Sequence, residues 1–204
     1  TALISGVLGF IGSFIARQLV EDNVVDKIVL LDHFGRYVDS SHREFLDYRK
    51  FRTKGIEDRI IIERGEARYY SVISNIMERY RPELIYHLAA LPLAKLPNLV
   101  SDEAIEGCVT STSNLLEIAG KMKKKDGYEP KRFIYASSSM VYGDFLKSTA
   151  DEEHPTNPKD IYGTMKLAGE QVTKGLSRYF GIKSSIIRPS AVYGPTDMNR
   201  RVSQ

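Results

Sequence analysis

The sequence has few of the features that mark secreted proteins or metalloproteins. Only one of its 204 residues, Cys108, is a cysteine, so neither an internal disulfide nor a multi-cysteine metal site can form. A single cysteine is typical of a reducing compartment, and we expect the protein to be cytoplasmic. The four histidines show no metal-ligand spacing, so we expect no bound metal.

Long apolar runs and blocks of like charge are also missing. No run approaches the roughly 18 apolar residues that cross a bilayer, and no cleavable signal segment opens the chain. The 29 Lys and Arg against 26 Asp and Glu give a net charge of +3. With no block of five like charges, the chain offers little to a nucleic acid or an anionic membrane, and we expect neither as a partner.

Six short apolar runs alternate with segments of helical period. Runs that are apolar on both faces are typical of buried parallel strands, and the alternation predicts an α/β fold, a Rossmann-type doubly wound parallel sheet with helices on both faces. The expected strands are Ala2–Ser5, Lys27–Asp32, Ile60–Glu63, Leu84–Leu88, Arg132–Ala136 and Ser184–Arg188. The expected helices are Ile11–Glu21, Ser71–Arg81, Glu103–Lys123 and Tyr162–Tyr179.

Other parts of the chain do not follow this pattern. Residues 36–59 are dense in Arg, Lys, Asp and Tyr, and we expect a surface excursion with a polar helix there. Thr1 leads directly into the first expected strand, and residues 199–204 carry no cap, Gly or Pro that would end an element. We therefore expect the chain to be an excerpt of a longer protein.

Three glycines follow the first expected strand at G-x-x-G-x-x-G spacing. Gly6 permits a tight turn, Gly9 lets the backbone approach a pyrophosphate, and Gly12 lets the next helix pack closely on the strand. Phosphates would then meet free N–H groups at a helix N-terminus. The alternative is a glycine-rich turn without a ligand, which costs stability that packing alone seldom justifies.

An acidic residue stands where a dinucleotide site needs one. Asp32 ends the second expected strand, twenty positions after Gly12, where a carboxylate accepts hydrogen bonds from an adenosine ribose and repels a 2′-phosphate. This predicts NAD rather than NADP. Arg36 and Arg43 lie close enough in sequence to keep NADP as an alternative, and Asp32 taken alone could be a turn cap.

Tyr162 and Lys166 lie four residues apart, on one face of an expected helix. A nearby ammonium favours the phenolate of a tyrosine, which is otherwise a poor base at neutral pH. A second pair at this spacing, Tyr179 and Lys183, is interrupted by Gly181. The first pair is therefore the candidate for acid/base chemistry.

Three serines, Ser137, Ser138 and Ser139, follow the fifth expected strand. Ligands of open α/β sheets bind at the carboxyl ends of the strands, so these hydroxyls are candidates for substrate contact. The alternative is a serine-rich loop that satisfies its own backbone.

Together these sequence motifs resemble those of the extended short-chain dehydrogenase/reductase family, in its NAD-dependent epimerase/dehydratase branch, which acts on nucleotide sugars. The matching motifs occur in order along almost the whole chain: GVLGFIG at Gly6–Gly12, LLD at Leu30–Asp32, YHLAA at Tyr86–Ala90, SSSMVYG at Ser137–Gly143, YGTMK at Tyr162–Lys166 and RPSAVYGP at Arg188–Pro195.

The resemblance implies roles for individual residues. Tyr162 would be the catalytic acid/base, Lys166 would lower its pKa and hold the nicotinamide ribose, and Ser138 would hydrogen-bond the reacting sugar oxygen. The cofactor site that it implies comprises Gly6, Gly9, Phe10, Ile11, Gly12, Asp32, Glu66, Ala67, Leu88, Ala89, Ala90, Tyr162 and Lys166. Relatives commonly form homodimers through the helices expected at 103–123 and 162–179, so a homodimer is implied too.

The chain also departs from the family. Glu66-Ala67 stands where an Asp usually meets the adenine, and Cys108 replaces a common Asn. Dehydratases of this family carry an Asp-Glu pair directly after the active-site hydroxyl residue, where this chain has Ser139 and Met140. Residues 1–204 would form the NAD-binding domain, and a small substrate domain is expected beyond residue 204.

The resemblance favours an enzyme that epimerises C4 of a UDP-hexose or UDP-uronate through a transient keto sugar. A nucleotide-sugar reductase or dehydratase on the same scaffold is the enzymatic alternative. A non-catalytic NAD-binding module is the alternative of another class. Loss of Tyr162 or Lys166 would have favoured the module, and both are present.

Overall fold

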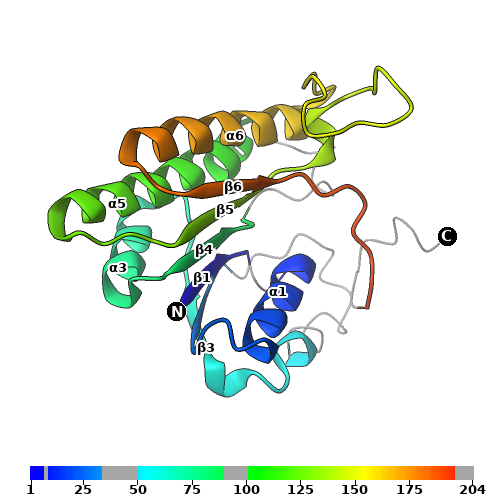
Figure 1. Cartoon of the computed structure of the whole chain (residues 1–204). Coiled ribbons are helices and arrows are strands. Elements are labelled where there is room, and N and C mark those ends of the chain that lie inside the picture. Colours follow the sequence, from blue (N-terminus) through cyan, green and yellow to red (C-terminus); the bar gives the residue numbers. More distant parts are fainter. Residues whose placement is uncertain (7–8, 34–49, 90–100, 196–204) are drawn as a thin grey trace.

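A computed structural model describes residues 1–6, 9–33, 50–89 and 101–195. Its six strands form one parallel sheet in the order β3-β2-β1-β4-β5-β6, so the topology reverses between β1 and β4 (Figure 1). The strands are β1 (Ala2–Ser5), β2 (Ile28–Asp32), β3 (Ile60–Arg64), β4 (Leu84–His87), β5 (Arg132–Ala136) and β6 (Ser184–Ile187). Each expected strand is confirmed to within one residue at each end.

Helices cover both faces of this sheet, which confirms the doubly wound architecture. Helix α1 lies on one face, and α3, α5 and α6 lie on the other (Figure 1). Their bounds are α1 (Phe10–Glu21), α3 (Tyr70–Tyr80), α5 (Ser111–Asp126) and α6 (Ile161–Phe180). None of the described helices is both long and apolar enough to cross a membrane.

The described residues form two hydrophobic clusters, one on each face of the sheet. Successive side chains of a strand point to opposite faces. Leu3 of β1 therefore joins the cluster under α3, α5 and α6, whereas its neighbour Ile4 joins the cluster under α1. Both are fully buried, which explains why the strand has no polar alternation in its sequence.

The helix expected at Glu103–Lys123 is divided in the structure. It comprises α4 (Ser101–Ile105), a π-helical turn over Glu106–Thr110, and α5. The hydroxyls of Ser111 and Thr112 donate to the carbonyls of Gly107 and Cys108, each at 2.6 Å, and so bind this wider turn. A π-helical turn contains about one residue more than an α-helical turn. One extra residue shifts the spacing of the apolar residues too little for the sequence pattern to reveal it.

The segment expected to leave the regular pattern, residues 36–59, lies partly outside the described residues. Residues 50–53 are helical, and Arg17 of α1 donates to the carbonyl oxygens of Arg52 and Lys54 at 3.4 and 3.1 Å. Arg36 and Arg43, on which the NADP alternative rested, lie outside the described residues, as do residues 196–204.

Helix α6 approaches the sheet at a glycine. A Cβ atom on Gly169 would stand 2.1 Å from the Tyr135 hydroxyl and 3.1 Å from the Cys108 carbonyl oxygen. A Cβ atom on Gly175 in the same helix would meet nothing within 4 Å. The contact of α6 with β5 and the π-helical turn therefore depends on Gly169 having no side chain.

We expect Gly169→Ala to lower the free energy of unfolding by about 1–3 kcal/mol, because the added methyl group overpacks a buried contact. Gly175→Ala is the matched control, and we expect it to raise stability by up to about 1 kcal/mol through helix propensity. Urea unfolding monitored by circular dichroism gives both values. Equal changes in the two variants would contradict the close approach at Gly169.

Candidate active site

Gly6 and Gly9, the two described glycines between β1 and α1, leave little room for a side chain. Gly6 adopts a φ of +74°, and a Cβ atom on it would lie 3.0 Å from the Cα of Ala89. Gly9 is the N-cap of α1, which has no acidic residue in its first turn and no side-chain cap among the described residues. First-turn N–H groups attract an anion, so this cradle fits a pyrophosphate.

Phe10, Ile11 and Gly12 form the first turn of α1. The Phe10 ring packs edge-on against Phe14 at 5.4 Å, and Ile11 is 39% exposed. Gly12 is buried. The segment after β6 reaches this turn as well, since a Cβ atom on Gly194 would lie 3.4 Å from the tip of the Phe10 ring. Phe10, at the start of α1, therefore lies close to Gly194, near the last described residue of the chain.

The two acidic residues expected near the adenosine lie at the carboxyl ends of neighbouring strands. Asp32 ends β2, and its carbonyl oxygen accepts from the Gly65 amide at 3.1 Å, just beyond β3. The Glu66 carboxylate pairs with Arg68 at 2.5 Å, and the side chain of Asn114 donates to the Ala67 carbonyl at 3.2 Å. Asp32 and the 65–67 turn are thus brought to the same edge of the sheet.

The segment after β4 passes directly beneath the glycine loop. The amides of Leu88 and Ala89 donate to the Ser5 carbonyl oxygen at 3.2 Å and to its side-chain Oγ at 3.3 Å. Ala90, the third residue implied here, lies outside the described residues. Ser5 therefore holds the described part of this segment against the end of β1.

Buried His87 has a tautomer fixed by its partners. The Ser111 hydroxyl donates to the Gly107 carbonyl, so it accepts from Nε2–H of His87 at 3.0 Å. Nδ1 then accepts from the Ser5 hydroxyl at 2.7 Å, and Ser5 accepts from the Ala89 amide. Burial, together with the charge of Lys166, lowers the pKa of His87 to about 3. A neutral His87 is a structural residue, as its place in an expected strand indicates.

Tyr162 and Lys166 lie on the first turns of α6, which begins at its N-cap Asp160. The Lys166 side chain is 3% exposed, and its ammonium donates to the Ala136 carbonyl at 2.6 Å. That ammonium lies 5.7 Å from the centroid of the half-buried Tyr162 ring. Burial lowers the pKa of Lys166. The arrangement places a cation beside the Tyr162 phenol at the carboxyl end of β5.

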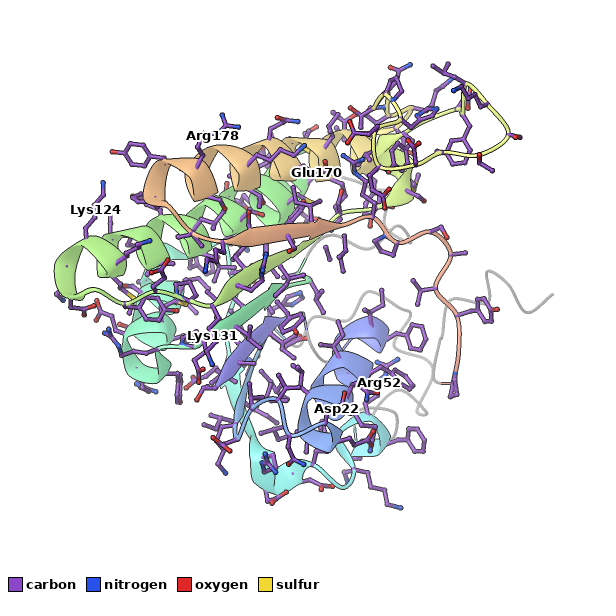
Figure 2. All side chains as sticks on the ribbon, in the orientation of Figure 1. Asp22, Arg52, Lys124, Lys131, Glu170 and Arg178 are labelled. Carbon is purple, nitrogen blue, oxygen red and sulfur yellow. The ribbon has the colours of Figure 1, made fainter. Side chains whose placement is uncertain are left out.

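The second Tyr/Lys pair lies elsewhere. Tyr179 is 70% exposed near the other end of α6, where Lys124 of α5 lies 4.6 Å from its ring centroid. Figure 2 places Lys124 and Arg178 at this end, away from the strand ends that carry the serines. Tyr179 is therefore far from the candidate site, and its variants can serve as controls.

The three serines have different surroundings. The Ser137 hydroxyl donates to Glu170 at 2.6 Å, and the Ser139 amide donates to the Pro189 carbonyl at 2.9 Å. Ser138 is 8% exposed, and its Oγ accepts from the Met140 amide at 3.2 Å, which leaves its O–H available as a donor. The Ser138 hydroxyl is therefore able to donate to a substrate oxygen, whereas that of Ser137 already donates to Glu170.

Two further residues of this region, Glu170 and Arg188, were not among the expected site residues. Their side chains form a two-point ion pair, with both nitrogen-to-oxygen distances at 2.8 Å. Burial raises the pKa of Glu170, but hydrogen bonds from Arg188 and Ser137 outweigh burial, and the net shift is downward. The sequence signal for Glu170 was its place four residues after Lys166, on the same face of the helix.

Relatives of this chain include both epimerases and dehydratases. A Methanocaldococcus jannaschii protein provisionally named UDP-glucose 4-epimerase is 30% identical over 94% of this chain and 56% of its own. The dTDP-glucose 4,6-dehydratase of Neisseria meningitidis is 28% identical over 95% of this chain and 53% of its own. The chain thus spans about half the length of these curated relatives.

A solved structure with a similar fold is that of the UDP-glucuronic acid 4-epimerase from Bacillus cereus in complex with UDP-glucuronic acid and NAD. It has a TM-score of 0.78 and 25% identity, over 95% of this chain and 57% of that one. Comparison with protein families matches residues 2–204 to the NAD dependent epimerase/dehydratase family. This match, the parallel sheet and the glycine cradle lead to one conclusion: the chain belongs to the NAD-dependent epimerase/dehydratase family, an extended short-chain dehydrogenase/reductase branch.

Proposed function

We propose that this chain is the NAD-binding domain of a nucleotide-sugar 4-epimerase that acts on a UDP-hexose or UDP-uronate. The observation that carries the proposal is the position of Tyr162, Lys166 and Ser138 at the carboxyl end of β5. The glycine cradle lies at the same edge of the sheet, after β1. Acid/base groups thus stand beside the place where a dinucleotide would lie.

The glycine cradle would hold the pyrophosphate of NAD, and Asp32 its adenosine ribose. The 66–67 turn would lie along the adenine, and Leu88, Ala89 and Ala90 beneath the cofactor. When bound, NAD supplies a hydride acceptor that can return the hydride to either face of a keto sugar. That chemistry suits an epimerase, since it leaves no net oxidation.

Tyr162 would remove the proton of the sugar hydroxyl at C4 and later return it. The Lys166 ammonium, itself buried, would stabilise negative charge on the phenolate oxygen of the neighbouring Tyr162. Ser138 would donate a hydrogen bond to the reacting sugar oxygen and fix its distance from Tyr162. The same three residues serve oxidation and reduction, as reversible epimerisation requires.

Epimerisation is favoured over dehydration by the residues after Ser138. Elimination of water from the sugar needs an acid for the leaving hydroxyl and a base for the C5 proton. Ser139 and Met140 occupy those places, in a short 3-10 turn over Ser139–Val141. Neither a hydroxyl of very high pKa nor a thioether can exchange protons in those roles. We also propose that the protein is cytoplasmic and forms a homodimer.

We expect NAD to bind more tightly than NADP, because the Asp32 carboxylate accepts from ribose hydroxyls and repels a phosphate. Asp32→Ala should weaken NAD binding and narrow the difference between the two cofactors. Isothermal titration calorimetry of the chain with NAD and NADP measures this. Tighter binding of NADP, or NAD affinity unchanged by Asp32→Ala, would refute the assignment.

Tyr162→Phe should lower turnover by roughly 10²–10⁴-fold, the usual contribution of a positioned acid/base group, with NAD affinity nearly unchanged. The measurement is steady-state kinetics of the protein encoded by the complete open reading frame that contains this sequence. Tyr179→Phe is the matched control, since Tyr179 is exposed at the other end of α6. A greater loss in the control would mean that the acid/base tyrosine is misassigned.

Incubation of the same protein with UDP-glucose, UDP-glucuronate and dTDP-glucose should yield C4 epimers of a UDP sugar and negligible elimination of water. NMR spectra of the reaction products distinguish the outcomes. A 4-keto-6-deoxy sugar would mean a dehydratase, and net consumption of NADH with a keto sugar would mean a reductase. NAD binding without conversion of any of the three sugars would point to a non-catalytic module.

A further inference from the structure

A buried ion pair joins α6 to the end of β6. Glu170 has no exposed side-chain area, and Figure 2 places it between α6 and β6. The Arg188 side chain is 15% exposed and donates through Nε and Nη2 to the two carboxylate oxygens of Glu170, both at 2.8 Å. Burying two charges costs free energy that their attraction often only offsets. Stability alone is therefore a weak explanation for this pair.

The Lys174 ammonium of the same helix lies 3.9 Å from Glu170. The hydrogen bonds of the pair to other groups lead to the serine turn and the segment after it. Nη1 of Arg188 donates to the Tyr142 hydroxyl at 3.0 Å and to the Glu152 carbonyl oxygen at 3.2 Å. The guanidinium lies 4.9 Å from the centroid of the Tyr142 ring. Glu170 also accepts from the Ser137 hydroxyl at 2.6 Å, next to Ser138. One ion pair thus holds both ends of the turn that carries Ser138.

The segment between this turn and α6, residues 144–160, packs against Tyr142, which is itself a partner of Arg188. The Tyr142 ring packs edge-on against Phe145 and His154, with centroids 6.1 and 5.5 Å apart. Nε2 of His154 accepts from the Leu146 amide at 3.0 Å, which closes the segment on itself. The segment ends at Asp160, the N-cap of the helix that carries Tyr162. Arg188 therefore anchors the chain between the two candidate catalytic hydroxyls.

We propose that Glu170 and Arg188 are positioning residues for the substrate side of the site. They hold Ser138 and residues 144–154 in place over the ends of β5 and β6, and they act through those groups. The cradle for the dinucleotide lies after β1 and β2, on the other side of the reversal between β1 and β4. Its described residues form no hydrogen bond or ion pair with Glu170 or Arg188. The identity of the substrate as a nucleotide sugar rests on the proposed function, whereas the anchoring does not.

Arg188→Lys tests the anchoring, because an ammonium cannot replace a planar fork that binds a carboxylate, a hydroxyl and a carbonyl together. The chain offers a matched control. Arg81 also binds a carboxylate at two points, Asp126 at 2.8 and 2.9 Å, and its guanidinium lies 5.1 Å from the ring centroid of Tyr128. Arg81→Lys therefore makes the same change in a more exposed pair that does not contact the site.

Hydrogen–deuterium exchange on the 204-residue chain gives the first readout. We expect Arg188→Lys to speed exchange of the 138–154 amides by about tenfold or more through local opening, with β1 and α1 unchanged. Arg81→Lys should leave residues 138–154 unchanged. Tyr142→Phe, which removes only one contact of Arg188, should speed exchange in the same residues by a smaller factor. This milder variant decides the matter if Arg188→Lys fails to fold.

Ligand binding gives the second readout, which a general loss of stability would not reproduce. We expect Arg188→Lys, made in the protein encoded by the complete open reading frame, to weaken binding of UDP-glucuronate to the NAD-loaded protein by about tenfold, with NAD affinity within about twofold of that of the unaltered protein. Unchanged exchange at 138–154 in both site variants, or equal effects of Arg81→Lys, would overturn the inference. If the unaltered protein encoded by the complete open reading frame bound no nucleotide sugar, the proposed function would be refuted, and the exchange rates alone would decide the anchoring.

Discussion

The candidate site depends on burial of the Lys166 ammonium against the end of β5. An ammonium that is 3% exposed is stable only with a partner, and the Ala136 carbonyl provides one at 2.6 Å. This hydrogen bond ties α6 to the end of β5 one turn after Tyr162. The close packing of α6 on the sheet at Gly169 makes this hydrogen bond possible, because a side chain at Gly169 would hold the helix away from Tyr135.

Two kinds of group therefore meet at this edge of the sheet. After β1 and β2 the groups are largely backbone, namely a glycine cradle, a helix N-terminus and one carboxylate. After β5 and β6 they are side chains, held by a buried ion pair and by hydrogen bonds from neighbouring hydroxyls. Backbone groups suit a pyrophosphate, whose shape varies little, and side chains suit a substrate that must be distinguished from its isomers. The division between backbone groups and side-chain groups falls at the reversal between β1 and β4, and it therefore follows from the strand order.

The sequence predicted the parts of this arrangement that local pattern determines. Strands such as Ala2–Ser5 were predictable because both of their faces are buried, and Gly6 because its turn requires a positive φ. The π-helical turn was missed, since hydroxyl-to-carbonyl bonds at Ser111 and Thr112 leave the apolar period nearly unchanged.

The ion pair between Glu170 and Arg188 was missed for another reason. Its members lie 18 residues apart on different elements, and no periodicity links them. The tautomer of His87 likewise depends on Ser5 and Ser111, residues 82 and 24 positions away. Local pattern thus predicted the elements, while the long-range polar contacts needed the structure.

The strand order also governs when the site can form during folding. β1 lies at the centre of the sheet and pairs with β4, so that Ala2 meets Leu84 and Ser5 meets His87. The floor of the glycine loop is therefore closed by residues more than 80 positions later, and Ser138 is held only after β6 has joined the sheet. Pairings of such long sequence separation form slowly, because the intervening chain must be ordered first. Until then the edge of β1 that pairs with β4 remains uncovered, and an uncovered strand edge can pair with another chain and promote aggregation.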